Sequence, residues 1–329
     1  PAKFNFKPYT MAGLTNYSDI RLTDYEEPKS WGLNYTDQSR NNLGMDIEYR
    51  INTNSRLTFT INPDYGQVES DPAEINLTAF ETYFHEKRPF FLKDVDIFET
   101  PLNIFYSRRI GEKIWGEGMK IYENTSNGNN DTLYYDMPVI IKGASKITGK
   151  TNKGLSYGVL GAVTSLYDSS GWSNQLLKGK NRNFFVSRIK QDFFAGNSFI
   201  GFMSTSSVID SAHTFSIDGL ANIFDNKIGI DGQIIMTSDE HKGIYSSISF
   251  SPLGFFSGWI DYYKYDKNLN FNNLGYLWRN DYSQTKMGMK FQTLDPWHFV
   301  RGGTVIIEGN MEQNIDGLDL GKTIELNYD

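Results

Sequence analysis

The chain has 329 residues, a formal net charge of −7 at pH 7 and no cysteine. The negative charge argues against a nucleic-acid partner, which needs a basic surface, and the missing cysteines exclude disulfides and thiol chemistry. Aromatic residues make up 15% of the chain and there are 30 glycines, a composition typical of strands joined by many turns. No apolar run reaches the roughly 18 residues of a transmembrane helix, and residues from Pro1 onward do not have the pattern of a signal peptide. Because the chain starts at Pro1, we expect a mature or excised piece of a longer product.

The N-terminal part of the chain predicts β-strands. Residues 3–14 alternate between apolar and polar side chains, and residues 44–51 do so more strictly. Residues 56–61 continue the alternation after a short link, 52–55, that predicts a hairpin turn.

The stretch 61–111 breaks this alternation. It holds four prolines, six phenylalanines and many charges of both signs. Inside a strand array, such a run is either a long functional loop or a piece of chain folded into the interior. Its ring-rich, charge-balanced composition is unsuited to lipid. We therefore predict that residues 62–101 leave the wall and fill or gate the lumen, or pack at its periplasmic mouth, and that residues 76–83 form a short helix capped by Asn76.

Acids and bases in this stretch are expected to form ion pairs, because Arg–carboxylate bonds are favourable in a partly enclosed lumen. The candidates are Glu69, Asp71, Glu81, Glu86, Lys87, Arg88, Arg108 and Arg109. Two acids of this stretch could also form the carboxylate pair of a glycosidase. The candidates for that pair are Glu69, Asp71, Glu74, Glu81 and Glu86. Acids beside several arginines are more often structural, so no catalytic residue is assigned.

Four sequence words lie in this stretch in close order: NPDYGQVESDP (62–72), NLTAFET (76–82), EKRPFFL (86–92) and FYSRRIG (105–111). Together they resemble the signature of a family of Gram-negative outer-membrane β-barrel domains of unknown function. In that family the barrel commonly follows a domain like the family-nine carbohydrate-binding modules. The resemblance implies an outer-membrane barrel and brings no reaction with it.

After an expected solvated loop at 122–136, strand patterns continue almost without interruption. Most of these segments run about 9–11 residues, the length that crosses a bilayer at the tilt of a barrel. Aromatic residues gather near segment ends, as in interfacial girdles. The predicted strands lie in 137–150, 155–164, 183–193, 197–207, 214–219, 227–236, 241–250, 254–265, 285–292, 298–309 and 320–328.

One predicted strand carries a row of lysines on its polar face: Lys142, Lys146 and Lys150. They are candidates for lining the lumen and attracting anions. The alternative interpretation is a solvated strand face without a special role.

We therefore predict an all-β fold, an antiparallel transmembrane β-barrel of roughly fourteen to sixteen strands. Residues 1–329 form one outer-membrane barrel domain, with 62–101 as its irregular plug or gating segment, and the barrel is expected to be incomplete at its C-terminus because a strand pattern is running there. Soluble β-propellers and sandwiches also alternate, but no blade-length repeat is present.

The expected function is that of a non-enzymatic protein of the Gram-negative outer membrane, surrounded by its lipid. It binds or passes a solute, such as a glycan or a breakdown product of one. The alternatives are a surface glycan hydrolase that uses the central acids, and an anchor that holds a partner protein in an outer-membrane complex. The four histidines lack metal-ligand spacing and no nucleotide fingerprint is present, so neither a metal nor a cofactor is expected.

Overall fold

The computed structural model describes residues 3–15, 38–63, 75–78, 80–112, 119–124, 130–135, 139–166, 181–208, 211–293 and 302–328. Fourteen strands form one sheet in the order β1-β2-β3-β6-β7-β8-β9-β10-β11-β12-β13-β14-β15-β16. They are β1 (Phe4–Thr15), β2 (Gln38–Asn52), β3 (Ser55–Ile61), β6 (Val139–Lys150), β7 (Leu155–Leu166), β8 (Asn181–Phe193), β9 (Ser198–Ser207), β10 (Ala212–Ile223), β11 (Ile228–Thr237), β12 (Lys242–Leu253), β13 (Phe256–Tyr265), β14 (Tyr282–Thr293), β15 (Gly303–Gln313) and β16 (Asp319–Tyr328).

The remaining elements are short. A separate hairpin pairs β4 (Met119–Asn124) with β5 (Asn130–Tyr135), and the helical turns are α1 (Pro89–Leu92), η1 (Val95–Phe98), η2 (Ser107–Arg109) and η3 (Phe194–Gly196). In the described ranges, no helix has the length and apolar character needed to span a membrane.

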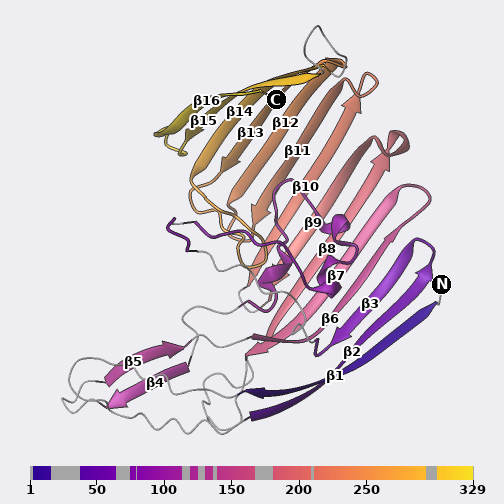
Figure 1. Ribbon diagram of the computed structural model, residues 1–329, viewed down its shortest axis with the longest axis vertical. Coiled ribbons are helices and arrows are strands. Elements are labelled where there is room, and N and C mark those ends of the chain that lie inside the picture. Colours follow the sequence, from indigo (N-terminus) through magenta and orange to yellow (C-terminus); the bar gives the residue numbers. More distant parts are fainter. Residues whose placement is uncertain are drawn as a thin grey trace.

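The predicted fold class is confirmed: the protein is all-β and each strand of the large sheet runs antiparallel to its neighbours. Consecutive strands pair throughout, except that β3 pairs with β6. The sheet curves into an open trough, and β1 and β16 form its two edges (Figure 1). Among the described strands these two edges are not paired with each other.

Two local expectations are wrong. Residues 75–78 and 80–83 are not helical. The Asn76 carboxamide oxygen instead accepts a hydrogen bond from the Thr78 amide at 2.9 Å, a local turn that competes with a helix. Strands β4 and β5 occupy most of the expected loop 122–136, because the Tyr, Thr and Leu residues of these segments favour strands.

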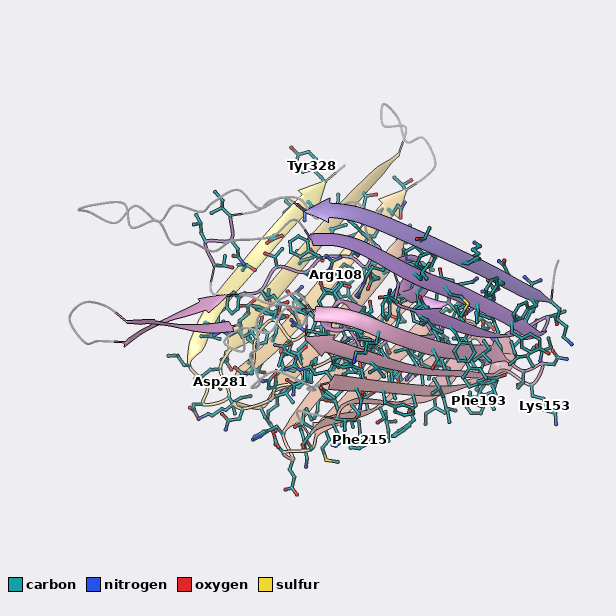
Figure 2. All side chains as sticks on the ribbon, turned by 90° about the horizontal axis from the view of Figure 1, so that it is seen from below. Arg108, Lys153, Phe193, Phe215, Asp281 and Tyr328 are labelled. Carbon is teal, nitrogen blue, oxygen red and sulfur yellow. The ribbon has the colours of Figure 1, made fainter. Side chains whose placement is uncertain are left out.

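On the outer face of the sheet the exposed side chains are apolar, and on strand β10 the buried inner side chains are polar. Soluble proteins show the reverse arrangement. On β10, Phe215 and Ile217 are 40% and 57% exposed, whereas Ser216 and Asp218 on the other face are each 2% exposed. Figure 2 shows Phe215 on the convex outside of the trough and Arg108 on its inside. Apolar side chains are likewise exposed at Phe185, Ile189, Ile200, Phe202, Ile230, Ile234, Ile248, Ile260, Met287, Met289, Val305 and Ile307. Such an outer surface suits contact with lipid tails.

Replacing Ile217 by lysine should therefore lower the free energy of unfolding from lipid vesicles by about 2–4 kcal/mol, the cost of a cation near the bilayer midplane. Asp239→Lys, in the exposed β11–β12 turn, is the matched control and should change stability little. Urea titrations of both variants in vesicles measure the difference. Equal, small effects at the two positions would contradict a lipid-facing surface.

The connections distinguish the two ends of the sheet. Tight turns join β2 to β3, β6 to β7, β8 to β9, β10 to β11 and β12 to β13 at one end, the short-turn end. The opposite end has the longest connections, β3–β6 and β13–β14 among them, together with short turns between β9 and β10 and between β11 and β12. Exposed rings gather at the tight turns, where a girdle is expected: Phe193, Phe194, Phe224 and Phe255. This asymmetry is typical of membrane barrels.

Candidate functional site

The internal segment (residues 80–112) belongs to the β3–β6 connection and lies on the inner face of the trough (Figure 1). Its η1 turn contacts β7, where a Cβ atom on Gly158 would lie 2.8 Å from the Phe98 ring, so only glycine leaves room for the phenylalanine. The main apolar core of the protein is therefore inside the trough. Its members from the segment are Phe90, Phe91, Phe98, Leu102, Ile104 and Ile110, and from the wall Ile141, Ala144, Leu160, Ala162, Phe184, Val186, Met203 and Ile235.

The β13–β14 connection (residues 266–281) covers the segment from the other side. Its Leu274 carbonyl accepts a hydrogen bond from the Tyr106 amide at 2.7 Å, and its Tyr276 amide donates to the Asn103 carbonyl at 2.8 Å. At Gly275 the two chains come so close that a Cβ atom would lie 2.8 Å from the Asn103 oxygen. The segment is thus held between the wall and a second long connection.

Glu86 and Arg88 tie the two ends of the segment together. The Glu86 carboxylate accepts bonds from Arg88 Nη2 at 2.7 Å and from the Arg88 amide at 2.8 Å, and Ser107 donates its hydroxyl to the same carboxylate. Arg88 in turn donates to the carbonyls of Ser107 and Ile110 at 2.7 and 2.6 Å. Burial alone would raise the pKa of Glu86, but the bonds from Arg88 and Ser107 outweigh it and the pKa is lowered.

Substituting Glu86→Gln should therefore loosen the segment at neutral pH, by roughly 1–3 kcal/mol in local stability. Because the pKa of Glu86 is lower in the folded than in the unfolded chain, its stabilisation is present above the ordinary carboxyl pKa and is lost as pH falls through the lowered value. The difference between variant and wild type should accordingly shrink in acid. Hydrogen–deuterium exchange of residues 80–112, corrected for intrinsic rates at each pH, measures it.

Glu112→Gln is the matched control for this experiment. Glu112 pairs with Arg109 at 3.0 Å, but its side chain is 43% exposed, whereas that of Glu86 is 8% exposed. Exposed pairs contribute little, so this variant should change exchange by less than about 1 kcal/mol. The same loosening in both variants would show that Glu86 has no special part in holding the segment.

The other predicted ion-pair candidates have varied surroundings. Arg109 is 9% exposed and contacts Glu81 at 2.6 Å, and Arg108 donates to the His85 carbonyl at 3.1 Å. Lys87 is half-buried and its amide donates to Glu86. Glu69, Asp71 and Glu74 lie outside the described residues. The two described acids of the proposed glycosidase pair, Glu81 and Glu86, each contact an arginine.

The three lysines of β6 do not share one environment. A bulge between Ile141 and Gly143 leaves Lys142 exposed. Lys146 is 2% exposed and its ammonium donates to the carbonyls of Phe90, at 2.8 Å, and Lys93. Lys150, near the short-turn end, pairs with Asp192 at 2.6 Å. Lys146 therefore fastens the segment to the wall.

Several further anchors of the segment were not foreseen. The Gln233 side chain accepts a hydrogen bond from the Leu102 amide at 2.6 Å. Asp94 accepts bonds from Arg56 at 3.0 Å and from Thr148 at 2.9 Å. Their only signal in the sequence is that the wall residues belong to inward-facing strand positions.

Tyrosine hydroxyls add neutral contacts. Burial raises the pKa of Tyr106 to about 12, so its hydroxyl stays protonated; it donates to the Phe84 carbonyl at 2.8 Å and accepts from the Phe84 amide at 3.0 Å. Within the described part of the chain, no cluster of three or more His, Asp or Glu side chains is arranged to hold a metal ion.

An antiparallel sheet of fourteen strands, an apolar outer face and an inner face that carries the charged side chains and a packed internal segment define a protein of the transmembrane β-barrel class. The chain belongs to a family of domains of unknown function (DUF5916), whose profile matches residues 1–326. It is similar to the crystal structure of the outer membrane protein opdK from Pseudomonas aeruginosa, with 11% identity over 100% of this chain and 77% of that one and a TM-score of 0.42. A comparison with curated proteins found no match.

Proposed function

We propose that the chain is an outer-membrane β-barrel protein of a Gram-negative cell, and that it passes a polar solute along its inner face. In this proposal the internal segment is the plug that narrows the path. The observation that carries it is the apolar outer face of a sheet whose charged and polar side chains, such as Arg188 and Asp218, lie on the inner face, around a trough that holds a packed segment.

A polar path is supported by the part of the inner face that lies beyond the segment. Across β11 to β15, Asp231, Ser247, Asp261, Lys286 and Asn310 stand directly opposite one another in register. All five are half-buried or exposed. A row of carboxylates, amide, hydroxyl and ammonium groups can replace the water around a polar solute as it moves.

For the kind of solute, we propose a glycan or its breakdown product. Aromatic side chains of the segment and of the β13–β14 connection meet there: the Phe80 and Trp278 rings lie 5.1 Å apart, and those of Tyr83 and Tyr276 lie 5.0 Å apart. Phe80, Tyr83 and Trp278 are 39%, 41% and 39% exposed. The exposed parts of these rings offer apolar surface against which the C–H groups of a sugar can pack.

Liposome swelling tests this function. The full chain, reconstituted into liposomes, should admit arabinose and glucose and exclude progressively larger oligosaccharides, because the segment narrows the lumen. Swelling no faster than that of empty liposomes would overturn the proposal. Release of shortened products from a glycan panel would favour the hydrolase, and a stable co-purifying protein without swelling would favour the anchor.

A further inference from the structure

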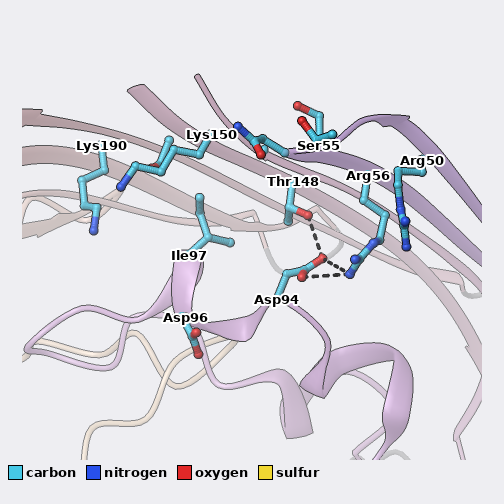
Figure 3. A pocket seen from close by; sticks show the side chains of 13 residues that line it. Arg50, Ser55, Arg56, Asp94, Asp96, Ile97, Thr148, Lys150 and Lys190 are labelled. Atoms are coloured by element: carbon cyan, nitrogen blue, oxygen red, sulfur yellow. Dashed lines mark hydrogen bonds and ion pairs between the residues drawn. The ribbon is translucent and has the colours of Figure 1, made fainter. Parts of the chain in front are cut away.

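A cavity of about 470 Å³ lies between the internal segment and the wall, next to the β2–β3 turn at the short-turn end (Figure 3). Its size is within the range of small-molecule pockets. The wall contributes four cations, Arg50, Arg56, Lys150 and Lys190, from β2, β3, β6 and β8. The segment contributes two carboxylates, Asp94 and Asp96. The lining is therefore positive, in a chain whose net charge is −7.

Existing ion pairs do not remove this excess. Asp192 serves both lysines, at 2.6 Å from Lys150 and 4.0 Å from Lys190, so one negative charge faces two positive ones. Around Arg56, the partners are Glu48, at 2.9 Å, and Asp94, at 3.0 Å. A Glu48 oxygen also binds Lys93, so two cations and two carboxylates balance on this side and the positive surplus lies with Lys150 and Lys190.

The two lysines are placed to share a ligand. They come from different strands, and Figure 3 shows both side chains extending from the wall on the same side of the cavity, opposite η1. Arg56 and Asp94, bonded to each other, close the other side. Every wall residue named here stands on the inward face of its strand, so the cavity faces the inside of the trough and not the lipid.

We infer that this cavity binds a small solute that carries an oxyanion, a carboxylate or a phosphate, between the ammonium groups of Lys150 and Lys190. The inference rests on the proposed function in that the ligand arrives through the lumen. It adds a charge requirement: the acidic end of the solute meets the lysines, and its neutral part meets the hydroxyl and amide groups of the cavity, such as Ser156 and Asn54. Ammonium–oxyanion hydrogen bonds are stronger than bonds between neutral groups.

Calorimetric titration of the full chain in detergent micelles tests this with three sugars of the same ring: glucuronate, glucose 6-phosphate and uncharged glucose. We expect one or both anions to bind and glucose to bind at least about tenfold more weakly. Preference between the two anions tells whether the ligand class is carboxylate or phosphate. Binding should weaken as salt is added.

Lys150→Gln and Lys190→Gln should each weaken anion binding by roughly tenfold, and Lys190→Arg should retain it. Lys142→Gln is the matched control, because it removes a lysine of β6 that does not line the cavity. A gel-mobility shift on boiling confirms that each variant is folded. The inference would be overturned if glucose bound as tightly as the two anions, or if the anions bound both lysine variants as tightly as the wild type.

This result is separable from the proposed function, because binding in micelles needs no open pore. If the anions bind but liposomes do not swell, the site stands and the transport proposal fails. If liposomes swell but neither anion binds, the transport proposal stands and the site fails.

Discussion

A variant that lacks the internal segment should conduct ions several-fold better than the intact chain in planar bilayers. The segment supplies the buried side chains Phe91, Leu102 and Ile104, which are 2%, 5% and 0% exposed, so its removal empties the space in front of β6 to β11. Replacing residues 80–112 by a short Gly–Ser linker keeps every strand of the large sheet. Single-channel current at fixed voltage measures the change.

The deletion also uncovers apolar wall side chains. Leu160, Val186 and Ile235 are each no more than 1% exposed, and facing them with water costs about 1.5–3 kcal/mol per residue. A second deletion variant with threonine at these three positions lowers that cost and should fold with the same raised conductance. As a control, a Gly–Ser linker in place of the exposed residues 238–240 alters the β11–β12 turn at the same end and should leave the current unchanged. Unchanged conductance in a folded variant without the segment would show that the segment does not obstruct the path.

Breaking the buried ion pair of the wall should cause the largest loss of stability by a single substitution. Arg188 on β8 and Asp218 on β10 have side chains that are each 1% exposed, and Arg188 Nη2 lies 2.6 Å from an Asp218 oxygen. Arg188→Met leaves a buried carboxylate without its partner, which should lower the free energy of unfolding by about 3–5 kcal/mol. Urea titration of tryptophan fluorescence in vesicles measures it.

The double variant Arg188→Met, Asp218→Leu distinguishes the cost of an unpaired buried charge from the cost of changed packing. Because no unpaired charge remains, it should recover most of the lost stability. Gly201 on β9 lies beneath the guanidinium, where a Cβ atom would be 2.7 Å from Arg188 Nη1. Gly201→Ala should therefore lower the free energy of unfolding of the wild type. The same substitution should lower it less in the Arg188→Met variant, because the methionine side chain is more flexible. Arg188→Met alone with wild-type stability would contradict a structural role for the pair.

The sequence alone predicted which segments form strands and which of their side chains face outward or inward. Successive side chains of a strand point to opposite faces, so the alternation of Phe215 and Ile217 with Ser216 and Asp218 already separates outside from inside. The break in that alternation equally marked the stretch that leaves the wall. Both are local properties of the backbone, and the structure agrees with them on β10 and across the internal segment.

Local patterns failed where a neighbouring interaction decides the outcome. The helix expected at 76–83 is replaced by a turn because the Asn76 side chain bonds to the Thr78 amide. On β6, Lys142 is separated from Lys146 and Lys150 because one bulged residue changes the pairing between Ile141 and Gly143. A side-chain hydrogen bond or a bulge leaves the residue types of a segment unchanged, so neither could be predicted from composition.

The partners of the candidate site depended on the tertiary structure. Leu102 and Gln233 are 131 residues apart in the chain, and Arg188 and Asp218 are 30 apart, yet each pair is joined by hydrogen bonds. Which acid meets which base is set by strand register across the sheet and by the path of the segment over it. Alternation determines only the face of each side chain, and many registers satisfy the same alternation. The sequence by itself thus determined a strand array with a polar inside, and only the folded sheet decided which residues hold the segment and line the cationic cavity.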